Sequence, residues 1–151
     1  MEVMGITRNL ASFVARVILG IIFIFHGWQK LNKDGIDATE AYFKSLDIPL
    51  PAAAAWYSAL VEFGGGILLI LGVLTPLVSL LLIADMIGAI FYAHIDNGFW
   101  NADQGYELPL ALIAGLVAVG FADTGRIGGD GYLMNRRRRR RDLNRDRDVA
   151  Y

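Results

Sequence analysis

Three ionisable side chains, Arg16, Glu62 and Asp85, lie inside long apolar stretches of the sequence. A charge at the centre of a bilayer costs about 2.5–3.5 kcal/mol, so such residues usually face the protein interior and pair. At about 1.5 Å of rise per residue, Arg16 and Asp85 should lie roughly 9 and 12 Å from one membrane edge. Glu62 should lie about 13 Å from the other edge. We therefore predict an interior cluster of Arg16 with Asp85, Glu62 or both, as a structural counter-charge or, as we favour, part of a functional polar cavity.

A second set of polar residues is expected nearer one membrane surface and comprises His26, Lys30, His94, Trp100 and Glu107. His26 and Lys30 are four residues apart and share a helix face. His94 ends one apolar stretch, and Glu107 begins another, where the helix dipole favours a carboxylate. These residues are candidates for binding a polar ligand or for transferring protons. Single histidines at helix ends are more often interfacial hydrogen-bonding groups.

The composition excludes several kinds of redox centre. The chain has no cysteine, which excludes a thiol–disulfide centre, a cysteine-ligated metal and a cysteine nucleophile. Two histidines and a carboxylate could bind a metal, but their spacing is not diagnostic, and we predict no metal site. No cofactor is evident from the residues themselves.

The fold class follows from the length of the apolar stretches. A bilayer core needs about 20 mostly apolar residues per helix. We predict an all-α membrane protein, a four-transmembrane-helix bundle in residues 1–134, with helices at about 10–29, 53–74, 77–95 and 107–123. Thr75 and Pro76 form a tight turn between the second and third helices. A short amphipathic helix is expected between the first and second, starting near Asp37.

The basic residues predict the orientation. Ten of them flank the two chain ends, in Arg8, Arg126, the run Arg136–Arg141, Arg145 and Arg147, whereas the opposite loops hold only three lysines. The positive-inside rule therefore places both termini in the cytoplasm. Residues 135–151 form a basic cytoplasmic tail, expected to be disordered. Six consecutive arginines next to the membrane, Arg136, Arg137, Arg138, Arg139, Arg140 and Arg141, should contact anionic lipids, and no nucleic-acid partner is expected.

Taken together, these motifs resemble the DoxX family of bacterial membrane proteins. The resemblance rests on Arg16 to Leu31 in the first helix, Glu62 to Thr75 in the second, Asp85 to Trp100 around the third, and Gly105 to Leu110 before the fourth. It covers about residues 10–130. The segment Asp123–Asp130 lacks a serine that the family often has there, so no role is assigned to that segment.

The resemblance implies a plasma-membrane protein associated with redox or oxidative-stress chemistry, with an oxidoreductase assignment and protein partners in a membrane complex. Because the chain lacks an obvious redox centre of its own, electron transfer would need a quinone in the cavity or a partner subunit. In the quinone version, a histidine or a carboxylate would exchange protons with the quinone oxygens. Two alternatives stay open: a non-enzymatic membrane scaffold or assembly subunit, and a small-solute or proton-coupled carrier.

Overall fold

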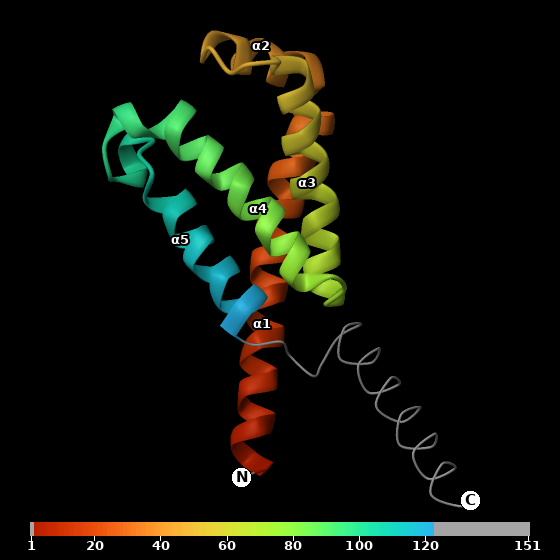
Figure 1. Cartoon of the computed structure of the whole chain (residues 1–151). Helices are drawn as coiled ribbons and strands as arrows, with labels where there is room; N and C mark the ends of the chain where they lie inside the picture. The colour runs from red at the N-terminus through yellow and green to blue at the C-terminus, as the bar shows by residue number, and fades with distance from the viewer. Residues whose placement is uncertain (1, 123–151) are drawn as a thin grey trace, which may run out of the picture.

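The computed structural model of the protein describes residues 2–122 and contains helices and turns, without a strand in that range. Four apolar helical segments pack one against the next, and a short helix crosses one end of them (Figure 1). The principal helices are α1 (Glu2–Trp28), α2 (Ile36–Ser45), α3 (Pro51–Leu71), α4 (Thr75–Ala89) and α5 (Glu107–Val117). The basic tail lies outside the described residues.

Three segments are long and apolar enough to cross a membrane: Asn9–Lys33, Pro51–Leu71 and Thr75–Asn97. The fourth, Glu107–Phe121, is a shorter apolar helix. The predicted all-helical membrane fold is thus confirmed for three spans, and the fourth is present but short. Many of the large apolar side chains on these segments are exposed, for example Phe25 at 70% and Phe91 at 63%. Such a surface suits lipid rather than water.

Short π-helical turns extend three of the helices. They are η1 (Gln29–Lys33) after α1, η2 (Ile90–His94) after α4 and η5 (Ala118–Ala122) after α5. In a π-helix the hydrogen bond skips one more residue than in an α-helix, which rotates the following side chains; such turns occur frequently at functional sites. Two 3₁₀ turns, η3 (Ile95–Asn97) and η4 (Asn101–Asp103), lie in the loop before α5.

Glycines set the separation and register of α1 and α3. A Cβ added at Gly66 would lie 2.6 Å from the carbonyl oxygen of Gly20, and one added at Gly27 would lie 2.7 Å from Cβ of Phe63. The two backbones are therefore in close contact, as small residues allow between membrane helices. The antiparallel register places residue 27 level with residue 63, and residue 20 level with residues 66 to 70.

One apolar layer closes the middle of the bundle. Phe23, Leu69, Leu82 and Leu116, one from each of α1, α3, α4 and α5, are all fully buried. A tight turn does join the second and third apolar helices, but it lies at residues 72–74, where Gly72 and Leu74 adopt left-handed backbone conformations. Thr75 and Pro76, predicted to form the turn, are instead the first residues of α4. The predicted short helix near Asp37 is α2.

Candidate functional site: a polar cavity within the helical bundle

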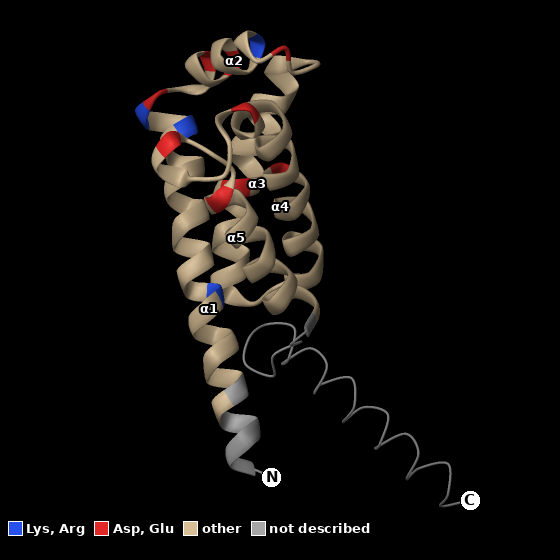
Figure 2. Ribbon diagram, turned by 90° about the vertical axis from the view of Figure 1, so that its left-hand side faces the viewer, with Lys and Arg blue, Asp and Glu red and all other residues tan. Residues whose placement is uncertain are grey.

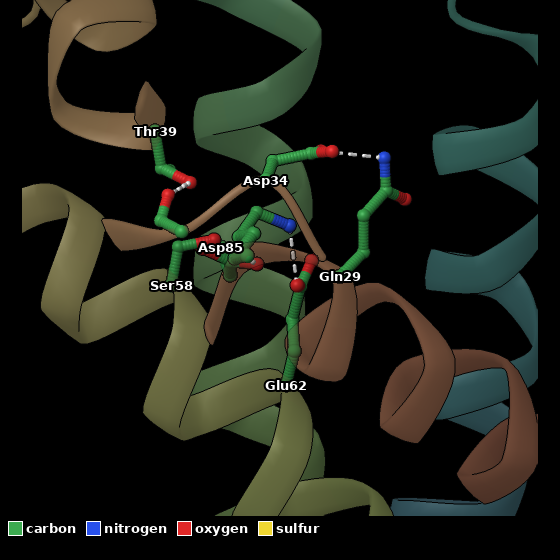
Figure 3. Close-up of polar contacts among 8 residues, drawn as sticks. Gln29, Asp34, Thr39, Ser58, Glu62 and Asp85 are labelled. Carbon is green, nitrogen blue, oxygen red and sulfur yellow. Dashed lines mark hydrogen bonds and ion pairs between the residues drawn. The ribbon is translucent and has the colours of Figure 1, made fainter. Parts of the chain in front are cut away.

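An ion pair between α1 and α3 forms the centre of the site. Lys30 Nζ donates a hydrogen bond to Glu62 Oε2 (Figure 3). The Glu62 side chain is 4% exposed and that of Lys30 is 21% exposed. Lys30 lies in η1, directly after α1, and Glu62 lies in the middle of α3. A buried carboxylate needs such a partner, because removing an ion from water costs several kcal/mol.

Asp85 places a second carboxyl group beside this pair. Asp85 belongs to α4, and its closest electrostatic neighbours include Glu62 and Lys30. Ser58 Oγ donates a hydrogen bond to Asp85 Oδ2 at 3.4 Å. Ser58 and Glu62 are one helical turn apart on α3, so one face of α3 carries both Glu62 and the hydroxyl group that contacts Asp85. The site therefore combines two carboxyl groups with one ammonium group.

These groups line a cavity of about 670 Å³. Aromatic side chains line part of its wall, namely Tyr42, Phe43, Tyr57 and Tyr92. The ionisable lining consists of His26, Lys30, Asp34, Glu62, Asp85 and His94. α2 contributes several lining residues, among them Ala38 and Thr39, and crosses the bundle at this end (Figure 1). Cavities that hold small organic ligands have volumes of about 300–1,000 Å³ with mostly apolar walls and a few placed polar groups.

Two π-helical turns bring polar residues to the cavity. η1 supplies Gln29 and Lys30, and η2 supplies Tyr92 and His94. Gln29 donates to the rim residue Asp34 at 2.8 Å through its side-chain amide. Because each turn follows a membrane-spanning α-helix directly, the change in helical pitch occurs where the polar side chains must face the interior.

The predicted pairing of Arg16 with the carboxylates is wrong. Arg16 is buried, at 3% exposure, but it does not line the cavity. Residue 27 is level with Phe63, and eleven residues of α1 separate it from Arg16, which is about 16 Å along the helix axis. The depth count from the sequence placed Arg16 too close to the α2 end, because it ended the first helix at residue 29, whereas α1 with η1 continues to Lys33. Lys30, predicted as a ligand-binding residue, is the cation next to Glu62.

The charged residues of the described chain are unevenly distributed between the two ends of the bundle. Figure 2 shows acidic and basic residues gathered toward the α2 end of the molecule, where the cavity lies. In the other half, residues 9–25, 64–83 and 108–122 contain one charged residue, Arg16. Its side chain is buried near that of Ser12, which precedes it by one turn on α1. Glu62 and Asp85 thus meet as predicted, while Arg16 belongs to the opposite half of the bundle.

The five other candidate residues divide into two groups. His26, Lys30 and His94 line the cavity. Trp100 and Glu107 do not: Trp100 is 64% exposed and packs edge-on against Phe99. Glu107 Oε2 accepts a hydrogen bond from the backbone N–H of Asn101 at 2.9 Å. In this structure both residues shape the loop before α5 and do not enter the cavity.

Sequence reasoning missed Ser58 and the tyrosines. Ser58 precedes Glu62 by four residues, so helical periodicity alone could have placed it on the same face. Tyr57 donates its hydroxyl hydrogen bond to the carbonyl oxygen of Leu81 at 3.0 Å, joining α3 to α4. Across residues 2–122, no group of three or more His, Cys, Asp and Glu side chains is arranged to hold a metal ion.

The fold and the cavity define a small helical membrane protein with an ionisable site inside the bundle. The chain belongs to the DoxX family, whose sequence profile matches residues 11–95. That match confirms the resemblance found in the motifs, and it includes all four of the residues Lys30, Ser58, Glu62 and Asp85.

Several bacterial proteins are similar to this chain. A Bacillus subtilis protein named "Putative oxidoreductase CatD" is 36% identical over 106 residues, which covers 70% of this chain and 76% of that protein. The Escherichia coli "Inner membrane protein YphA" is 32% identical over 97 residues, covering 64% and 66% respectively. A membrane protein of Mycobacterium tuberculosis, Rv3486, is 27% identical over 132 residues, with 80% of both chains covered. No solved structure matches this chain significantly.

Proposed function

We propose that this protein is a membrane subunit of a quinone-linked redox system and that it binds a quinone headgroup in the cavity beside Glu62 and Asp85. The single observation that supports this proposal best is the cavity itself. It brings acid–base side chains of the membrane-spanning segments together with aromatic rings from those segments and from α2. The oxidoreductase name of the Bacillus relative agrees with this class of function.

The cavity lining suits a quinone. A volume of about 670 Å³ falls within the range of small-molecule sites. The aromatic rings of Tyr42, Phe43, Tyr57 and Tyr92 offer apolar surfaces for a flat ring. Quinone carbonyl oxygens only accept hydrogen bonds, and His26 and the Lys30 ammonium can donate them from the wall.

The residues of the chain would bind the headgroup and exchange protons with it. A bound quinone supplies two-electron, two-proton chemistry, with the electrons exchanged with a partner redox protein in the membrane. Lys30 would orient the headgroup while it neutralises Glu62. Asp85, beside Ser58, would hold a proton close to the ligand. Two carboxyl groups and one ammonium group give the site a proton-exchanging group next to a fixed counter-charge.

The orientation predicted from the basic residues places this site relative to the cell. We propose a plasma-membrane location with both termini in the cytoplasm, so that α2 and the cavity lie toward the outer side. The Arg-rich tail would then face anionic lipids of the cytoplasmic leaflet. Partner proteins of the redox system would meet this subunit within the membrane or at that leaflet.

A photoreactive azidoquinone tests the proposal directly. The purified protein in lipid nanodiscs is irradiated with the azidoquinone, and mass spectrometry then maps the labelled peptides. We expect labelling of the cavity-lining segments around residues 26–30, 54–62 and 84–94, suppressed by excess ubiquinone-1. Labelling confined to the lipid-facing surface, or unaffected by ubiquinone-1, would contradict a quinone site.

Two matched variants connect the labelling to the acidic pair. Glu62→Gln removes the carboxylate that Lys30 contacts and should reduce cavity labelling about tenfold, the effect of losing roughly 1.4 kcal/mol of binding energy. Asp37→Asn changes an acidic residue on the exposed face of α2, outside the cavity lining. That control variant should be labelled like the wild type.

A proton-coupled carrier of a small solute is the second candidate, because two neighbouring carboxyl groups lie inside membrane helices. Ionisable groups in such positions often transfer protons in transporters. Reconstituted vesicles distinguish the two functions. A carrier accumulates a solute when a proton gradient is imposed and loses this activity in Asp85→Asn, whereas a quinone-binding subunit shows no solute accumulation.

A further inference from the structure

The loop between the third and fourth apolar segments forms a hydrogen bond with one ring nitrogen of His94. The Nδ1 atom of His94 lies 2.6 Å from the backbone carbonyl oxygen of Gln104. A carbonyl oxygen can only accept a hydrogen bond, so Nδ1 must carry the proton. In the neutral ring the other nitrogen, Nε2, then has a free lone pair and can only accept.

Several backbone hydrogen bonds fix the position of this carbonyl group. The carbonyl oxygen of Gly98 accepts from the N–H of Tyr106 at 3.1 Å, and that of Phe99 accepts from the N–H of Glu107 at 2.9 Å. Asn97 donates its side-chain amide to the same Gln104 oxygen at 3.4 Å. Gln104 itself adopts a left-handed conformation with φ of 63°.

Glycine at position 105 is required for this arrangement. A Cβ added there would lie 2.7 Å from the carbonyl oxygen of Phe99 and would also overlap that of Gly98. The loop therefore has little freedom next to the carbonyl that receives the proton of His94. Glu107, which accepts from the N–H of Asn101, closes the loop onto the start of α5. The loop acts as a support for one side of the imidazole ring.

The other side of the ring is available to the cavity. His94 lines the cavity, whereas no residue from Ile95 to Glu107 does. Because Nδ1 is directed to the loop, Nε2 is the ring nitrogen left for a ligand. A neutral imidazole fixed in this way presents an acceptor in the cavity, and the second nitrogen's partner determines the tautomer.

We propose that the loop formed by residues 95–107 fixes His94 as a hydrogen-bond acceptor for a hydroxyl group of an aromatic ligand. The fixed tautomer follows from the loop alone, whereas the ligand class rests on the function proposed above. A quinone has no proton to donate to Nε2, but a phenol or quinol hydroxyl has one. His94 therefore favours the hydroxylated form of the ligand, and the loop residues are positioning residues.

Nuclear magnetic resonance of labelled histidines tests the tautomer without any ligand. The chain has two histidines, so ¹⁵N-histidine labelling of the protein in nanodiscs gives a simple spectrum, and His26→Asn leaves His94 alone. At alkaline pH, where the ring is neutral, we expect a single tautomer with the proton on Nδ1. A ring protonated on Nε2, or a mixture of tautomers, would overturn the proposal.

Two loop variants distinguish the effect of the Gln104 backbone carbonyl group on the His94 tautomer from the effect of the Gln104 side chain. Gly105→Ala forces the loop away from His94 and should give a mixture of tautomers. Gln104→Asn keeps the backbone carbonyl and should leave the spectrum unchanged; a tautomer shift there would show that the side chain is responsible. If Gly105→Ala does not fold, the wild-type spectrum still decides the question.

A pair of probes tests the hydroxyl preference. 2,3,5-Trimethylphenol and its methyl ether differ only in the donor group. We expect the phenol to bind the wild type about fivefold to tenfold more tightly, and to shift the Nε2 resonance, with the preference lost in His94→Ala. Equal binding of the two probes, or an unchanged Nε2 resonance, would contradict a hydroxyl contact at His94. Failure of the azidoquinone labelling would refute the quinone function and leave the tautomer result intact.

Discussion

Lys30 and Glu62 form an ion pair across the interface of α1 and α3, and the glycine contacts farther along these helices set the register that makes the pair. The Lys30 ammonium reaches Glu62 from a π-helical turn. The Glu62 side chain is nearly inaccessible to solvent, so Lys30 is the group that balances its charge. The position of Lys30, and with it the charge balance of the cavity, depends on the local helix geometry. A shift of α1 by one turn along α3 would move Lys30 about 5 Å and separate the two charges.

Removing the lysine should destabilise the protein strongly. Lys30→Met leaves Glu62 buried without its cation, and breaking a buried ion pair on one side costs about 3–5 kcal/mol. Thermal unfolding in mild detergent, followed by circular dichroism, measures the loss. Lys44→Met, on the exposed surface of α2, is the matched control and should unfold like the wild type.

The double variant Lys30→Met/Glu62→Gln completes this test. Replacing both members of a buried pair is often close to neutral, so most of the lost stability should return. If Lys30→Met alone unfolds at the wild-type temperature, the ion pair does not contribute to the fold.

Two neighbouring glycines on α3 should respond in opposite ways to alanine. A Cβ at Gly66 would lie 2.6 Å from the Gly20 carbonyl oxygen and 2.8 Å from Cγ1 of Ile24, whereas a Cβ at Gly64 meets nothing within 4 Å. Gly66→Ala should cost about 1–3 kcal/mol through overpacking. Gly64→Ala should be neutral or stabilising by up to about 1 kcal/mol, because alanine favours helix. Comparable unfolding temperatures for the two variants would argue against close contact of α1 and α3.

The orientation can be measured with single cysteines, because the natural chain has none. Asp96→Cys places a thiol on the exposed loop after α4, and Ala150→Cys places one in the tail. A membrane-impermeant maleimide added to intact spheroplasts should label position 96 and should label position 150 only after lysis. The reverse pattern would place both termini outside and the cavity toward the cytoplasm.

The basic tail should bind anionic membranes. Arg136 to Arg141 should each contribute about 1 kcal/mol near a negatively charged surface. A peptide of residues 135–151 should therefore bind phosphatidylglycerol-containing vesicles in co-sedimentation experiments. This binding should weaken as the salt concentration is raised, and the peptide should not bind vesicles of phosphatidylcholine alone. A peptide with the six arginines changed to glutamine serves as the control. Equal binding of the two peptides would remove electrostatics as the cause.

Much of the architecture could be predicted from residue types alone. The spans, the tight connection between α3 and α4 and the helix α2 all depend on local features: apolar length, proline position and helical periodicity. The meeting of Glu62 with Asp85 was also predictable, since both are costly inside a membrane and must face the interior. The family assignment follows from the same motifs.

The partner of Glu62 could not be predicted in this way. Depth counted from the predicted end of each helix placed Arg16 within reach, because that count assumes that all helices share the same edges. Actual depth depends on how far α1 and α3 extend past one another, which the contacts of Gly20 with Gly66 and of Gly27 with Phe63 decide. Trp100 and Glu107 lie outside the cavity lining for a related reason: their position in the sequence next to lining residues does not determine the direction of the loop.

The sequence by itself determined that this chain is a helical membrane protein of the DoxX family with acidic groups inside its spans, because hydropathy and charge cost are properties of each segment alone. Only the tertiary structure decided that Lys30 is the cation beside Glu62, that Ser58 and four aromatic rings share the cavity, and that His94 is held from behind by a loop. Those contacts depend on helix register and on π-helical turns, which rotate side chains by fractions of a turn that apolar patterning does not encode.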